Sequence, residues 1–187
     1  MPLPANLQRE KAATPLSFKD VNRVTRIAVL VAGGLILFLF ESAIPRPLPW
    51  LKPGLSNLVT LIAFYLFGFR IAFVIMLLRV VTGAFILGTL FNPVFLFGLS
   101  GGIVATGMMG LFYFYFKKIF SILGISILGA FTHNLVQISL AAFLVIHSKQ
   151  VLYLMPIMLI SSLFSGFLVG IFAHYVVQKV DALNFLS

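Results

Sequence analysis

Five polar side chains lie within segments that are otherwise apolar, and they are the residues of this sequence best suited to bind another molecule. His133, Asn134 and Gln137 occur in the stretch GISILGAFTHNLVQISLAAF, at residues 124–143. On a helix, residues three and four apart share one face, so these side chains would offer hydrogen-bond donors and acceptors to a common cavity. We expect them to line a ligand-binding site. The alternative is that they only join helices by hydrogen bonds.

The other two are charged. Arg79 is the only basic residue well inside a predicted membrane span, and Glu41, near the end of the first span, is the only acid in one. A central charge costs about 2.5–3.5 kcal/mol on insertion scales, so such residues face a protein interior or a cavity. We assign both to the predicted substrate-binding site, where Arg79 would meet an anionic group of a ligand. A structural ion pair with Glu41, or a side chain that snorkels to the membrane surface, is the alternative.

The sequence holds little that supports catalysis or metal binding. It has no cysteine and four acids in all, Glu10, Asp20, Glu41 and Asp181, so it has no carboxylate cluster to hold Mg²⁺ against a diphosphate. It also lacks a phosphate-binding loop, a nucleophile elbow and a zinc-protease motif. We therefore expect no metal, no cofactor and no catalysis by this chain alone.

Membrane-spanning helices are the elements that must position these side chains. The chain of 187 residues is 61% hydrophobic and 9% charged, with a mean hydropathy of +1.13, which indicates an integral membrane protein. A bilayer core needs about 20 helical residues to cross it. We predict an all-α protein with six transmembrane helices, in blocks at about 24–44, 55–69, 71–91, 93–116, 121–147 and 150–178. The second block is short, and its boundary near Gly68 is the least distinct.

The basic residues predict the orientation of the chain. The net charge is +9, but the bases are spread among apolar blocks and do not indicate a nucleic-acid-binding face. With the N-terminus inside the cell, nine Lys and Arg residues lie on the cytoplasmic side and three outside. This predicts a cell-membrane protein with both termini cytoplasmic. Its expected parts are an N-terminal segment at 1–22, a transmembrane domain at 23–180 and a tail at 181–187.

The longest external connection, ESAIPRPLPWLKPGLSN, is rich in proline, which restricts it to extended or turn conformations. It is either a simple connection or a lid, at residues 45–54, over a cavity that opens outward. The lid residues that we single out are Pro45, Pro47, Trp50 and Lys52. Trp50 is the only tryptophan and would suit an interface anchor.

The first predicted span carries a pair of small residues. Ala28 and Ala32 lie four apart in the stretch AVLVAGG. Small residues at this spacing let two helices approach closely. The pattern is common in membrane helices, so packing within the chain is the simplest reading of it.

Several ordered motifs resemble a known family. The stretches ESAIPRPLPWLKPGLSNLVTLIAFYLFG, RVVTGAFILGTLF, FLFGLSGGIVATGMM and GISILGAFTHNLVQI are similar to the Gx transporter family, whose members are often labelled heptaprenyl diphosphate synthase component I. The resemblance covers residues 24–178. That family in turn resembles the S components of energy-coupling factor (ECF) transporters, six-helix membrane proteins that bind a vitamin or similar micronutrient from outside.

The resemblance implies partners and roles. In such transporters two cytoplasmic ATPases and a transmembrane coupling protein supply the drive. An AxxxA motif on the first helix packs on the coupling protein, and Ala28 and Ala32 match it. The loop after the first helix is a substrate lid, and residues 45–53 stand at that place.

Three functions follow as hypotheses. The first is an S component of an ECF importer for a small micronutrient or precursor. The second, suggested by the label, is a non-catalytic membrane accessory subunit of a heptaprenyl or polyprenyl diphosphate synthase, since this chain has only two aspartates and no Asp-rich motif. The third is a structural membrane protein whose polar residues only lock its helices together.

Overall fold

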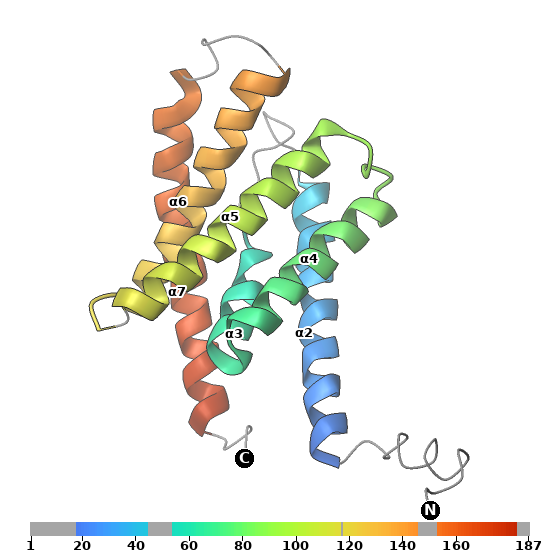
Figure 1. Ribbon diagram of the computed structural model, residues 1–187, viewed down its shortest axis with the longest axis vertical. Helices are drawn as coiled ribbons and strands as arrows, with labels where there is room; N and C mark the ends of the chain where they lie inside the picture. Colours follow the sequence, from blue (N-terminus) through green and yellow to red (C-terminus); the bar gives the residue numbers. More distant parts are fainter. Residues whose placement is uncertain (1–17, 45–53, 117, 146–152, 183–187) are drawn as a thin grey trace, which may run out of the picture.

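The computed structural model describes residues 18–44, 54–116, 118–145 and 153–182. These residues form six α-helices and one short π-helix, with no strand among them (Figure 1). In chain order they are α2 (Phe18–Ala43), α3 (Asn57–Phe67), α4 (Phe69–Ile86), α5 (Pro93–Phe116), α6 (Ile122–Leu140), η1 (Ala141–Val145) and α7 (Met155–Ala182). The predicted all-α bundle is confirmed.

Five of these helices are long and apolar enough to cross a bilayer, so the chain is a multi-pass membrane protein. The exception is α3, which has 11 residues. At 1.5 Å per residue it is about 16 Å long, roughly half of the hydrocarbon thickness. Gly68, with φ of 86°, ends α3 and lets α4 begin at the next residue. The predicted span at 55–69 is therefore a half-length helix that starts inside the bundle.

Successive α-helices, the short α3 included, run alternately up and down. The start of α2, the junction of α3 with α4, the turn from α5 to α6 and the end of α7 lie at one end of the bundle (Figure 1). We call it the basic end, because α2 starts there with two arginines and the other three places carry one described base each: Arg23, Arg26, Arg70, Lys118 and Lys179. Lys and Arg are in excess in the cytoplasmic loops of membrane proteins, so this clustering predicts that the basic end is cytoplasmic.

Helices α6 and α7 approach each other closely through glycines of α7. A Cβ atom added at Gly166 would lie 2.8 Å from the Cα of Ile127 and 3.2 Å from the carbonyl oxygen of Ser126. The hydroxyl of Ser126 donates to the carbonyl oxygen of Gly166 at 2.7 Å. The two backbones are therefore in direct contact, which fixes the position of α6 and its polar side chains.

We expect Gly166→Ala to lower the free energy of unfolding by about 1–3 kcal/mol, because the added methyl group meets backbone that cannot yield without moving a helix. Gly107→Ala in α5 is the control, since an added Cβ meets nothing within 4 Å there. Unfolding in mild detergent measures both. Equal stability of the two variants would contradict the direct backbone contact.

Candidate functional site

A small polar cavity lies among α2, α3, α4 and α6, with Gly98 of α5 and Ser165 of α7 also on its wall. Its volume is about 30 Å³, enough for a water molecule or two, which need about 10–15 Å³ each. All five predicted site residues line it: Glu41, Arg79, His133, Asn134 and Gln137. Since α4 and α6 both run away from the basic end, Arg79 and Gln137, late in these helices, place the cavity in the opposite half of the bundle (Figure 1). The structure brings the five together, and their binding role is taken up below as a proposal.

Arg79 is buried with unused donors. Its side chain is 2% exposed, and its Nη2 donates to the Oδ1 of Asn57 at 3.0 Å. Its Nε and Nη1 are buried without a hydrogen-bond partner. A buried N–H group left unsatisfied costs about 1–3 kcal/mol. A ligand acceptor that reached these two groups would offset that cost.

Glu41 has a partner other than a ligand. Its carboxylate, with the side chain 0% exposed, accepts hydrogen bonds from the backbone N–H groups of Leu55 and Ser56, the latter at 3.2 Å. These groups precede the first turn of α3, where Ser56 makes no side-chain cap. A carboxylate satisfies such orphan N–H groups and complements the positive end of the helix dipole. Glu41 thus positions the start of α3 and a wall of the polar cavity.

The three polar residues of α6 have different surroundings. The Nδ2 of Asn134 donates to the carbonyl oxygen of Met158 at 3.3 Å, a bond between α6 and α7. Gln137 is 2% exposed, and its Oε1 has no hydrogen-bond partner. His133 faces α5, where a Cβ atom at Gly101 would come within 2.9 Å of its Nδ1. Asn134 therefore joins helices, as the structural alternative predicted, whereas Gln137 has an acceptor to spare.

Sequence reasoning missed Asn57, the first residue of α3, which lines the polar cavity and accepts from Arg79. The sequence signal that could have identified Asn57 is a polar residue at the first turn of a buried helix. The bond fixes the orientation of the guanidinium group.

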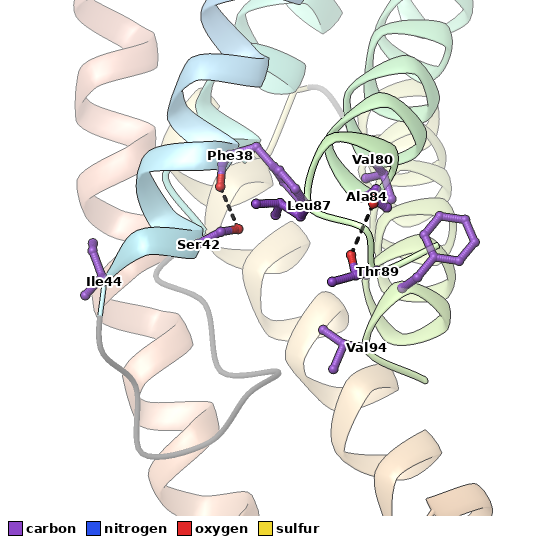
Figure 2. A pocket seen from close by; sticks show the side chains of 10 residues that line it. Phe38, Ser42, Ile44, Val80, Ala84, Leu87, Thr89 and Val94 are labelled. Carbon is purple, nitrogen blue, oxygen red and sulfur yellow. Dashed lines mark hydrogen bonds between the residues drawn. The ribbon is translucent and has the colours of Figure 1, made fainter. Parts of the chain in front are cut away.

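A larger cavity of about 410 Å³ adjoins the polar one (Figure 2). Its walls come from the ends of α2 and α4, the turn after α4 and the start of α5: Phe38, Ser42, Ile44, Val80, Ala84, Leu87, Thr89, Val94, Phe95 and Gly98. Phe38, Val80 and Gly98 line both cavities. The hydroxyls of Ser42 and Thr89 donate to the carbonyl oxygens of Phe38 and Ala84, at 2.9 Å and 3.4 Å (Figure 2). The larger cavity is therefore mostly apolar.

The predicted lid residues Pro45, Pro47, Trp50 and Lys52 lie outside the described residues. The residues on either side of that segment are described. Ile44 lines the larger cavity and Gly54 lines the polar cavity. The two described residues that flank positions 45–53 therefore belong to the walls of different cavities.

Ala28 and Ala32 are both exposed on α2. An added Cβ at the neighbouring Gly33 meets nothing within 4 Å. This small-residue face of α2 therefore does not pack against another described helix of the chain, and it is open to a partner or to lipid.

Comparison with known families gives one clear match. Residues 30–176 match the sequence model of the family described as heptaprenyl diphosphate synthase component I. The chain belongs to this family. The predicted family membership is confirmed, and the matched region includes all five residues that were predicted to bind substrate. Neither a search of curated proteins nor a search of solved structures gives a significant match.

We expect Glu41→Ala to destabilise this family member by about 1–3 kcal/mol, because two buried backbone N–H groups lose their acceptor. Glu41→Gln retains an acceptor oxygen and should cost less. Thr25→Ala, on the same helix, is a neutral comparison, since the exposed Thr25 hydroxyl donates to the carbonyl oxygen of Val21 in its own helix. Unfolding in detergent, with hydrogen exchange at the Leu55 and Ser56 amides, measures the effect. Unchanged stability and exchange in Glu41→Ala would refute the capping role.

Proposed function

We propose that this chain is the substrate-binding membrane subunit, or S component, of an ECF-type importer for a small micronutrient or precursor. The observation that carries the proposal is Arg79, a buried cation on the wall of a cavity whose Nε and Nη1 have no hydrogen-bond partner. An ionisable residue inside a membrane bundle that faces a cavity is by default a functional site. His133, Asn134 and Gln137 complete the polar wall, and Glu41 holds α3 in place beside it.

The position of the cavities supports uptake from outside. Both lie toward the end of the bundle opposite the basic end, and the positive-inside rule places the basic end in the cytoplasm. The cavities would then be reached from the external side of the cell membrane. The Pro-rich segment at 45–54 would act as a lid, and support for this comes from Ile44, which precedes it and lines the larger cavity, and Gly54, its last residue, which lines the polar cavity.

Energy for import must come from other chains, because this sequence has no phosphate-binding loop. Two cytoplasmic ATPases and a transmembrane coupling protein would supply it. The exposed Ala28 and Ala32 would form the face of α2 on which the coupling protein packs. Movements of that protein would then reorient the loaded subunit and release substrate inside.

A second candidate is supported by the family description. The chain would be a membrane accessory subunit of a heptaprenyl diphosphate synthase, and the apolar cavity would receive part of a prenyl chain. With two aspartates and no Asp-rich motif, the chain would leave Mg²⁺ binding and chemistry to a soluble partner. The two candidates differ in the partner that they require.

Gentle purification of the tagged protein from its native membranes, followed by mass spectrometry, identifies that partner. We expect a coupling protein with two ATPases. The Ala28→Leu/Ala32→Leu variant should recover at least about tenfold less of it, because overpacking costs about 1–3 kcal/mol per site and 1.4 kcal/mol is tenfold in affinity. Thr82→Leu/Ser161→Leu, which changes exposed small residues of α4 and α7, should recover the wild-type amount.

Two outcomes would contradict these assignments. Recovery of an Asp-rich polyprenyl synthase subunit in place of the coupling protein would establish the second candidate. Equal recovery of the coupling protein by wild type and the Ala28→Leu/Ala32→Leu variant would show that the coupling protein does not pack on the small-residue face of α2.

A further inference from the structure

The polar cavity and the larger cavity form one site with two chemically different parts. They share Phe38, Val80 and Gly98 as walls. Arg79 lies before Ala84 on α4 and before Leu87 in the turn that follows, so the polar part is deeper in the bundle and the apolar part is nearer the external end. A molecule that filled both parts would place a polar head inward and an apolar body outward.

The hydrogen bonds around the polar cavity call for an acceptor at Arg79. Arg79 is the single cation and Glu41 the single acid among its described lining residues. Both oxygens of Glu41 already accept from the backbone before α3, whereas the Nε and Nη1 of Arg79 lack acceptors. The amide of Gln137, whose oxygen and NH₂ group exchange places on rotation, can add a donor or an acceptor. The two unpartnered nitrogens of Arg79 need an acceptor, and a carboxylate makes the stronger, charge-assisted hydrogen bonds with a guanidinium group.

The volume of the polar cavity limits which head groups can bind. At about 30 Å³, the polar cavity admits a group on the scale of one or two water molecules. A carboxylate is close to that scale. A diphosphate is several times larger and carries more than one negative charge, and proteins usually bind it with Mg²⁺ or several cations. The described lining offers one cation.

The larger cavity determines the size and polarity of the ligand body that can bind. Its volume of about 410 Å³ falls in the range of 300–1,000 Å³ typical of small-molecule sites. The two hydroxyls drawn in Figure 2 are already bonded to backbone carbonyls, which leaves aliphatic and aromatic side chains to contact a ligand. Such a wall suits a hydrocarbon or an aromatic body.

We propose that the substrate is an amphiphile with one compact anionic head of carboxylate type, bound at Arg79, and an apolar body that occupies the larger cavity. This assignment rests on the proposed function for the statement that the ligand is transported. The binding itself is a property of this chain alone.

Three probes that share one apolar body test the assignment: geranic acid, geraniol and geranyl diphosphate. Binding is measured by equilibrium dialysis with the purified protein in nanodiscs, and empty nanodiscs correct for partition into lipid. Geranic acid should bind saturably and at least about tenfold more tightly than geraniol, the effect expected of a charge-assisted hydrogen bond. Geranyl diphosphate should bind more weakly than geranic acid.

Two kinds of variant separate the head from the body. Arg79→Gln should abolish the preference for geranic acid over geraniol while leaving geraniol affinity within about twofold, because the apolar cavity is unchanged. Gly98→Leu should weaken both probes at least about tenfold, because position 98 lines both cavities and an added Cβ meets nothing within 4 Å, so the side chain enters the site. Gly107→Leu, on the same helix and equally unobstructed, is the control and should bind as wild type.

Equal affinity for geranic acid and geraniol, tighter binding of the diphosphate, or no saturable binding of any probe would overturn the assignment. Each outcome is distinguishable from failure of the proposed function, which is measured by the recovered partners. Selective binding of geranic acid without a coupling protein would keep the ligand class and refute the transport role. Recovery of the coupling protein together with equal binding of geranic acid and geraniol would support the transport role and refute the ligand class.

Discussion

The rest of the structure depends on the carboxylate of Glu41 and the two backbone N–H groups that it accepts from, those of Leu55 and Ser56. A helix that starts inside a membrane protein exposes N–H groups where no bulk water can satisfy them. Glu41 supplies the acceptor, and its charge complements the positive end of the α3 dipole. The half-length α3 can therefore begin deep in the bundle, with Asn57 against Arg79.

This arrangement explains how an arginine is oriented and left available for a ligand in a membrane protein. One nitrogen of Arg79 is held by Asn57, which orients the guanidinium group, and two others are left without acceptors. The nearby acid is occupied by backbone, so it does not neutralise Arg79 by a direct bond that the structure describes. A buried donor without an acceptor destabilises the empty protein and favours a ligand that supplies one.

Part of this architecture follows from the sequence. Hydrophobic blocks of bilayer length predict the all-α bundle, and charged or amide side chains in such blocks are costly enough to identify Arg79 and Gln137 as cavity residues. The sequence indicated that the second block is short, with a boundary near Gly68, but not that its helix has only 11 residues, because hydropathy locates apolar blocks and does not fix the ends of a helix. The capping role of Glu41 was missed because its partners lie 14 and 15 residues away, beyond any local pattern.

Other features could not be predicted for a different reason. The larger cavity is defined by side chains that are small, such as Ala84 and Gly98, and an apolar sequence does not distinguish filled from empty space. The spacing of Ala28 and Ala32 is the same for internal and external packing, and only the structure shows that both are exposed. The lid at Pro45, Pro47, Trp50 and Lys52 stays a prediction.

The most direct test of the central claim, that the adjoining cavities hold a small molecule, is mass spectrometry of what the protein carries from its native membrane. Wild type, Gly98→Leu and Gly107→Leu would be purified in parallel and extracted with organic solvent. We expect one small amphiphile to be enriched with wild type and Gly107→Leu and absent from Gly98→Leu. The same set of molecules in all three extracts would contradict the claim that these cavities form a binding site.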